Sequence, residues 1–270
     1  MGTPLLDDRQ GRRRCLSALG GCVTGNVMGC LAAMQFLTIA PPLVRRPFTA
    51  TELGRAVGYF PLVGLLIGGL LAALDRFLTS FLPPGVTAAL VLTAWILCSG
   101  ALHLDGFLDS CDGLFGGRTP EDRLRILRDE RIGAFAAIGG FLILLLRFQS
   151  LAALSSRSAA LWLAPVVGRW GMAGAVVAFP YGRAEGLGRA MKDHAGWFQA
   201  LLASATAALA AWLLGGRLGL LIMLLSGSLT WLVARFVLAR LPGWTGDIYG
   251  ALCELLEVLV LVAFVAGERG

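Results

Sequence analysis

The sequence predicts an all-α integral membrane protein, a polytopic bundle of about seven transmembrane helices in one membrane-embedded domain. Hydrophobic residues make up 57% of the chain, charged residues only 15%, and the mean hydropathy is +0.75. Soluble domains carry roughly 25% charged residues, so a soluble globular protein is excluded. Apolar stretches of about 20 residues recur along the chain, each long enough to cross a hydrocarbon core of about 30 Å as a helix.

The N-terminal region is the least regular part of the predicted bundle. Residues 1–30 are expected to be an N-terminal extension, and residues 31–270 the single membrane domain. The region 15–44 carries no charge, is rich in glycine and ends in Pro41-Pro42. We expect it to form an interfacial or re-entrant segment. The arginines at 12–14 before an apolar run resemble a signal peptide, but no clear cleavage site follows them.

Seven apolar windows predict the spanning helices, in the order 56–74, 85–104, 132–154, 159–181, 195–214, 218–234 and 248–266. The Lys and Arg residues outside these windows alternate strongly, with 17 in one set of intervening segments and 4 in the other. The positive-inside rule places the first set, and the N-terminus, in the cytoplasm, and the C-terminus outside. The basic residues form no single stripe, so no nucleic-acid partner is indicated. The six cysteines form no Cys-x-x-Cys pair, so neither a zinc site nor a disulfide framework is expected.

The strongest candidate for chemistry is an acidic motif directly after the second window. Asp105, Asp109 and Asp112 follow one another at i, i+4 and i+7, so on a continued helix their carboxylates share one face. Three like charges on one face repel unless a cation neutralises them. Hard oxygen ligands suit magnesium, which takes one or two carboxylates together with substrate phosphate oxygens and water. The alternative is a solvated acidic helix end, which is costly near a bilayer.

Four other residues of this motif and its surroundings could assist. Gly106 and Gly113 remove side chains beside the acids and would let a phosphate approach the backbone. His103, two residues before the first acid, could help to remove a proton, although a histidine at a helix end is usually structural. Asp129 could add a fourth metal ligand.

A new helix is expected after the acidic motif. Thr119 can cap it, Pro120 suits its first position, and Glu121 and Asp122 favour its positive end. The turn that follows carries Asp129 between Arg128 and Arg131, and either arginine could clamp phosphate oxygens. The bland alternative for these arginines is a solvated cytoplasmic helix.

Ionisable residues inside apolar windows need partners. Arg147 is expected to snorkel or to pair structurally, and Arg169 to contact substrate or an acid. Glu254 and Glu257 of the last window are the candidate partners, and pairing is at least as plausible for them as catalysis.

Two glycine-rich segments complete the candidates. In Pro180–Gly188 the loop could present Arg183 and backbone N–H groups to phosphate, the alternative being a simple interhelix turn. In Gly243–Gly250, Asp247 precedes the last window and lies at helical spacing from Glu254 and Glu257.

Six of these segments occur in an order and spacing that point to a family. They are Phe36-Leu37-Thr38, Phe60-Pro61-Leu62-Val63-Gly64, His103-Leu104-Asp105-Gly106 with Asp109 and Asp112-Gly113, Arg128-Asp129 with Arg131 and Gly133, Tyr181 to Gly188, and Thr245-Gly246-Asp247 with Gly250. From about Met34 onward the chain resembles cobalamin synthase, also called adenosylcobinamide-GDP ribazoletransferase. Glu130 and Ala134 stand where that family usually has Ser and Thr, and Gly182 where it usually has Ala.

The resemblance implies the last assembly step of the nucleotide loop of cobalamin. A ribose hydroxyl of α-ribazole, or of its 5′-phosphate, attacks the cobinamide-side phosphorus of adenosylcobinamide-GDP, and GMP leaves. Asp105, Asp109, Asp112 and Asp129 would hold magnesium, and one of them or His103 would act as base. Arg128, Arg131 and Arg183 would hold phosphate, and Asp247 would support the site or bind substrate.

Two other classes of membrane protein share some of these features. The Asp109-x-x-Asp112-Gly113 part also occurs in CDP-alcohol phosphatidyltransferases, but the Ala-Arg pair and second acidic half of those enzymes are missing here. A transporter would place ionisable groups near the midplane of two matching halves, whereas here the acids cluster at one face and no repeat is evident. We therefore expect a magnesium-dependent phosphotransferase of the bacterial inner membrane, its active site on the cytoplasmic side. The sequence allows a homo-oligomer and leaves the oligomeric state open.

Overall fold

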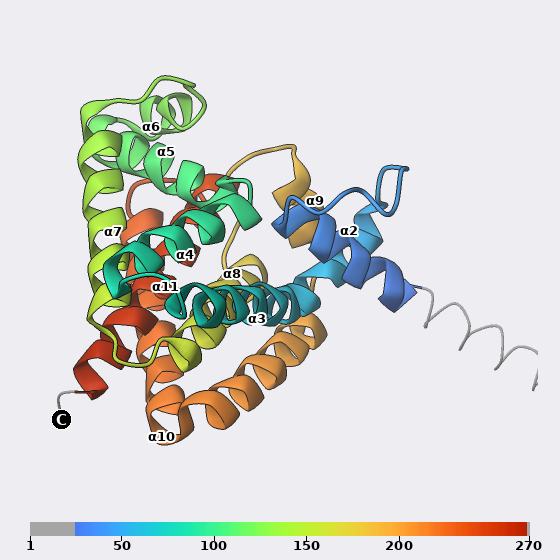
Figure 1. Cartoon of the computed structure of the whole chain (residues 1–270). Coiled ribbons are helices and arrows are strands. Elements are labelled where there is room, and N and C mark those ends of the chain that lie inside the picture. The colour runs from blue at the N-terminus through green and yellow to red at the C-terminus, as the bar shows by residue number, and fades with distance from the viewer. Residues whose placement is uncertain (1–24, 269–270) are drawn as a thin grey trace, which may run out of the picture.

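The structure, a computed structural model, describes residues 25–268, which form a bundle of helices (Figure 1). A helix over Gly25–Leu37 comes first. The order is then α2 (Ala50–Ala56), η1 (Val57–Tyr59), α3 (Phe60–Thr79), α4 (Pro84–Cys98), α5 (Leu102–Gly116), α6 (Pro120–Ile126), α7 (Ala134–Ala153), α8 (Ser158–Ala178), α9 (Leu187–His194), α10 (Trp197–Leu238) and α11 (Gly246–Gly267). The described residues contain no strand, only an isolated bridge between Tyr181 and Trp244. The predicted all-α fold is confirmed.

Helix α8 is the centre of the bundle and packs against α3, α10 and α11. Small residues allow these close approaches, as is usual between membrane helices. A Cβ atom on Gly64 or Gly68 of α3 would lie within 2.8 Å of the backbone of α8. On the other side of α8, a Cβ atom on Gly168 would lie 2.8 Å from Cys253 Sγ of α11.

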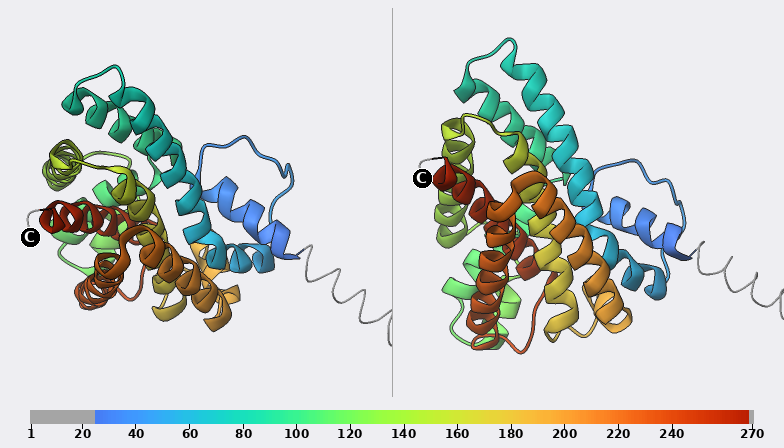
Figure 2. Two further views of the ribbon diagram at one scale, coloured as in Figure 1. Left: turned by 60° about the horizontal axis from the view of Figure 1, so that its bottom comes forward. Right: turned by 90° about the horizontal axis from the view of Figure 1, so that it is seen from below.

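Five helical stretches are long and apolar enough to cross a membrane, namely Ala50–Thr79, Ala134–Ala153, Ser158–Ala178, Trp197–Leu238 and Gly246–Gly267. The bent pair α4 and α5 would make a sixth. The predicted count of seven is therefore not confirmed. It differs because two predicted windows, 195–214 and 218–234, fall within α10. The backbone of that 42-residue helix leaves helical geometry at Gly216 (φ 53°, ψ −131°), where its two halves change direction (Figure 2).

The expected continuation of the second spanning helix through the acidic motif is wrong. Helix α4 ends at Cys98, and α5 begins at Leu102 after a bend of 87°. Gly100 and Ala101 both have φ of 59°, the left-handed conformation that commonly ends a helix. The acids therefore stand on a separate helix that crosses the direction of α4.

The described part of the N-terminal region contains the apolar helix Gly25–Leu37, which begins at the first described residue. Whether the region 15–44 forms an interfacial or re-entrant segment therefore stays a prediction. Residues 1–24, with the arginines at 12–14 and most of the predicted extension, lie outside the described residues.

Segments that the basic-residue pattern places on one side do meet in the structure. Segment 155–158 touches segment 75–84, because Arg157 contacts Asp75 Oδ1 at 3.0 Å and donates to the Pro84 carbonyl at 3.1 Å. Segment 105–131 touches segment 182–194, because Arg183 donates to the Leu127 carbonyl at 3.3 Å. The grouping of the segments is supported, while their orientation across the bilayer remains a prediction.

Candidate active site

Helix α5 carries the acidic motif along one face. Asp109 lies in the negative field of Asp105, Asp247 and Asp112, and Arg183 opposes this field. Asp105 is exposed and Asp109 half-buried. The predicted sharing of one helix face therefore holds, although the helix is not a continuation of α4.

A cavity of about 230 Å³ opens beside these acids. It is lined by Asp105, Asp109 and Asp112 of α5 and by Arg128, Asp129, Glu130 and Arg131 of the turn after α6. The turn is held by the Arg131 N–H, which donates to Asp129 Oδ1 at 3.2 Å. Six of the predicted site residues thus face one cavity, although at least 16 positions separate the two segments. We refer to it as the acid cavity.

The acid cavity opens outward toward a larger surface hollow of about 830 Å³. Arg128, Asp129 and Arg131 line both spaces, and Arg125 of α6 joins them in the outer one. Helix α6 presents this arginine as expected, since the Thr119 side chain accepts from the Asp122 N–H and Pro120 occupies the first position. The outer hollow is thus lined by three arginines together with three acids, Glu121, Asp129 and Glu130, and its arginines could contact an anionic group.

Asp112 has a structural task that the sequence reasoning missed. Its two oxygens accept hydrogen bonds from the N–H groups of Gly133 at 2.6 Å and Ala136 at 2.9 Å, at the start of α7. A carboxylate there satisfies orphan N–H groups and stabilises the positive helix end. A Cβ atom on Gly133 would lie 2.6 Å from the carboxylate, which accounts for glycine at that position.

The acids must also be tested against magnesium chemistry. Among residues 25–268, no group of three or more His, Cys, Asp or Glu side chains is arranged to hold a metal ion. Two carboxylates one helical turn apart, Asp105 and Asp109, remain on the wall of the cavity. Magnesium usually binds through one or two carboxylates and fills its other positions with phosphate oxygens and water, so this donor set fits it.

A second cavity, of about 270 Å³, adjoins Asp105, which lines both spaces. We call it the aromatic cavity, because Phe36, Phe60, Tyr181 and Tyr249 contribute to its wall. The rings of Tyr181 and Tyr249 stack with centroids 6.3 Å apart. Burial raises the pKa of Tyr181 above its usual value, so its phenol is neutral at neutral pH. The sequence analysis missed the aromatic wall, and tyrosines in glycine-rich segments were the available signal.

Arg183 and Asp247 meet at the aromatic cavity. The guanidinium contacts Asp247 Oδ2 at 2.7 Å, and Thr245 Oγ1 donates to the same oxygen at 3.1 Å. The structure thus brings both predicted residues beside Asp105. It pairs them with each other, which the sequence analysis did not foresee.

His103 and Gly106 also line the aromatic cavity, whereas Gly113 does not line either cavity. A Cβ atom on Gly106 would lie 2.8 Å from the Asp247 carbonyl oxygen, and one on Gly113 would lie 2.6 Å from the Leu127 side chain. Both glycines therefore let α5 pack closely against neighbouring segments. Their predicted contact with phosphate stays a prediction.

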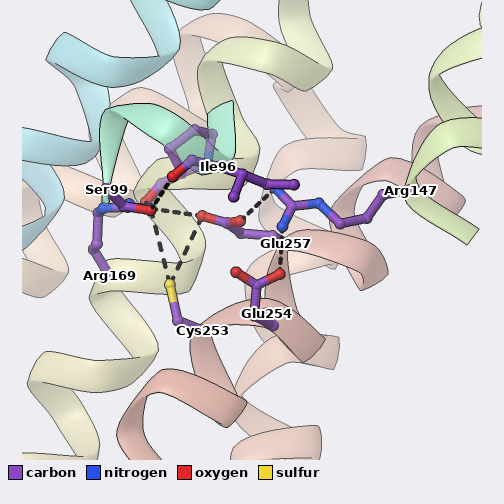
Figure 3. A network of polar contacts seen from close by, with 8 residues as sticks. Ile96, Ser99, Arg147, Arg169, Cys253, Glu254 and Glu257 are labelled. Carbon is purple, nitrogen blue, oxygen red and sulfur yellow. Dashed lines mark hydrogen bonds and ion pairs between the residues drawn. The ribbon is translucent and has the colours of Figure 1, made fainter. Parts of the chain in front are cut away.

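The intramembrane charges form a separate network deeper in the bundle (Figure 3). Glu257 of α11 lies between the two arginines, 2.9 Å from Arg147 of α7 and 2.5 Å from Arg169 of α8. Glu254 pairs with Arg147, whose guanidinium also stacks over the Trp95 ring at 4.3 Å. All four charged side chains are at most 5% exposed. The predicted pairing is confirmed, and the two positive and two negative charges balance.

Comparison with known protein sequences identifies the family of this chain. The family model described as cobalamin-5-phosphate synthase matches residues 29–265. Proteins named adenosylcobinamide-GDP ribazoletransferase are similar along most of their length. The one from Pseudomonas fluorescens is 43% identical over 236 residues, which cover 85% of this chain and 96% of that protein. The one from Pseudomonas syringae is 40% identical over 85% of this chain and 96% of its own length, and the one from Pseudomonas aeruginosa 43% over 86% and 96%. No solved structure matches.

The matched range contains every residue that lines the acid and aromatic cavities, from Phe36 to Gly250. The site described above thus lies wholly inside the family match. The chain belongs to the cobalamin-5-phosphate synthase family.

Proposed function

We propose that this chain transfers the adenosylcobinamide phosphate group of adenosylcobinamide-GDP to α-ribazole or α-ribazole 5′-phosphate, with release of GMP. The observation that carries the proposal is the position of Asp105 between two cavities of different chemistry. One holds carboxylates and arginines and suits phosphate groups, and the other has an aromatic wall. Family membership and the names of the relatives support the same reaction.

In this reaction a ribose hydroxyl oxygen of the acceptor forms a bond to the phosphorus next to cobinamide. The bond between that phosphorus and the oxygen bridging to the second phosphate breaks, and GMP leaves with that oxygen. The hydroxyl proton passes to a base, for which Asp105 is placed best because it faces both cavities. Such transfers depend chiefly on positioning the reactants in line and neutralising charge.

Different residues of the two cavities would bind the diphosphate, bind magnesium and orient the reactants. Arg128 and Arg131, at the mouth of the acid cavity, would hold the diphosphate of the donor. Asp105 and Asp109 would bind magnesium, which when bound would neutralise the diphosphate and the leaving group. The Arg183 guanidinium, fixed by Asp247, would orient the acceptor or the transferred phosphate.

We further propose that the chain is a multi-pass protein of the bacterial inner membrane with the acid cavity on the cytoplasmic side. The alternation of 17 and 4 basic residues supports this orientation. Cytoplasmic access is also what a nucleotide-linked substrate requires.

The direct test is GMP release from membranes that contain the protein, supplied with adenosylcobinamide-GDP, α-ribazole and magnesium. We expect GMP only when all three are present, and its loss on chelation of magnesium. CDP-diacylglycerol with an alcohol acceptor should yield no CMP, which separates this enzyme from CDP-alcohol phosphatidyltransferases. CMP without GMP would overturn the proposed function.

A further inference from the structure

The aromatic cavity has more polar groups than its own side chains satisfy. Three atoms of its lining residues are buried and have no hydrogen-bond partner among the described residues: His103 Nε2, Arg183 Nε and Tyr249 Oη. Buried polar atoms without partners are costly and rare in native proteins. The residues that carry these three atoms line the cavity, so a side-chain shift on binding would bring the atoms to a ligand that carries donors and acceptors.

The remaining wall of this cavity is apolar and flat. The Tyr181 ring is held in place by the stacked Tyr249 ring and by Gly188, where a Cβ atom would lie 2.6 Å from the Tyr181 ring. Met172 and Val176 of α8 contribute apolar surface opposite α5 and α11 elements. Aromatic walls of this kind favour flat rings, which stack on them or pack edge to face. The ligand should therefore combine a flat ring with hydroxyl or amide groups.

The charge of the wall narrows the ligand class. Asp105, Glu185 and Asp247 line the cavity, against one arginine, Arg183, whose guanidinium already pairs with Asp247. In the acid cavity magnesium would offset the carboxylates, whereas in the aromatic cavity the excess of carboxylates would repel an anionic group. A flat, uncharged ring with sugar hydroxyls fits best, and this is the chemistry of a nucleoside.

We infer that the aromatic cavity is the acceptor site, which takes the base and ribose of the nucleoside and presents a ribose hydroxyl to Asp105. The inference rests on the proposed function, and it assigns donor and acceptor to the two cavities that Asp105 lines. The donor diphosphate occupies the acid cavity, and the acceptor approaches the phosphorus from the aromatic cavity. In this arrangement the attacking hydroxyl and the leaving oxygen would reach the phosphorus through separate cavities, and in-line transfer needs them on different sides of that atom.

Two variants test the site without touching the acids. Tyr249→Phe removes one of the unsatisfied groups and keeps the ring. If Tyr249 Oη bonds the acceptor, the KM for α-ribazole should rise about 2- to 12-fold, the loss of one hydrogen bond. Val176→Phe fills apolar space and should raise the same KM more than 10-fold. Val177→Phe, one position along α8 and absent from the cavity wall, is the matched control and should leave that KM unchanged. In all three variants the KM for adenosylcobinamide-GDP should stay as in the parent protein.

Equilibrium binding of α-ribazole to the purified protein, without the donor, separates this inference from the proposed function. Binding that is weakened by Tyr249→Phe and Val176→Phe supports the acceptor site even if no GMP is released, in which case only the proposed function fails. If the parent protein releases GMP while both variants keep the parent affinity and KM for α-ribazole, the acceptor site is overturned. A rise in the KM for adenosylcobinamide-GDP alone would assign the cavity to the donor and overturn it as well. The result for Val176→Phe is used only if its thermal unfolding midpoint in detergent matches that of Val177→Phe. If the midpoints differ, the result for Tyr249→Phe alone tests the acceptor site.

Discussion

Two aspartates three positions apart on α5, Asp109 and Asp112, should respond differently to substitution by asparagine, the first through turnover and the second through stability. Asp109 makes no hydrogen bond that the structure records and lies among like charges, whereas Asp112 accepts from the N–H groups of Gly133 and Ala136. Asp109→Asn should therefore remove a functional charge at no cost in stability. Asp112→Asn should weaken the start of α7.

The magnitudes follow from these contacts. For Asp109→Asn, the loss of one electrostatic element at a phosphoryl-transfer site corresponds to about 10²–10³ in turnover, roughly 3–4 kcal/mol. Its stability should be unchanged or slightly raised, because repulsion from Asp105, Asp112 and Asp247 is relieved. For Asp112→Asn, the amide keeps one acceptor oxygen but loses the charge and the second acceptor, so unfolding should become easier by about 1–2 kcal/mol.

Both quantities can be measured on the same preparations, GMP release for turnover and unfolding in mild detergent for stability. Asp193→Asn, an exposed acid of α9 paired with Arg189, is the matched control and should change neither. Asp105→Asn combined with Asp109→Asn should be scarcely slower than either alone, because members of one catalytic unit are not additive. The reasoning is refuted for Asp109 if the variant keeps turnover within about threefold of the parent at the same magnesium requirement. It is refuted for Asp112 if turnover falls while stability stays unchanged.

Three further predictions follow from other contacts. Glu257→Gln leaves two buried arginines and only one buried carboxylate in the network, so the bundle should lose about 3–5 kcal/mol of stability in detergent unfolding. An unchanged unfolding midpoint would contradict the network's role. Arg183→Lys keeps the charge but not the planar guanidinium that reaches Asp247 and the Leu127 carbonyl, so turnover should fall while membrane insertion stays normal. The control Arg189→Lys, on exposed α9, should change turnover little. Equal turnover in both variants would leave Arg183 a structural residue. In a background without the six native cysteines, single cysteines near positions 80 and 216 should be labelled from the periplasm, and those near 118 and 188 only after permeabilisation. The reverse pattern would invert the proposed orientation.

The sequence predicted the features that depend on local composition. Apolar windows located helices α7, α8 and α11 to within a few residues, because length and hydropathy suffice for a membrane helix. Thr119 and Pro120 predicted the start of α6 from capping alone. The buried pairing of Arg147 and Arg169 with Glu254 and Glu257 was also accessible, since charges inside a bilayer must find partners.

The features that depend on contacts between distant segments were not accessible. The apolar window 85–104 runs across the bend at Gly100 and Ala101, because hydropathy does not register a left-handed backbone. The three acids of α5 were treated as one unit, yet Asp112 turned out to cap a helix that begins 22 positions later. Nothing in the local sequence of Asp112 identifies the start of α7 as its partner. The only sequence feature related to this contact is Gly133, which leaves room for the carboxylate.

The buried charge network explains how α11 is fixed relative to α5, and with it the side chains that line the two cavities. Asp247, Glu254 and Glu257 stand on one helix, α11, and seven residues separate the first two, about 10 Å along the axis. The carboxylates of Glu254 and Glu257 fix α11 to α7 and α8 through Arg147 and Arg169, while Gly106 allows its first turn to press against α5. An uncompensated charge at that depth is so costly that α11 cannot slide or rotate without breaking the pairs. The placement of Asp247, and with it Arg183, relative to Asp105 is therefore set two turns away from the site.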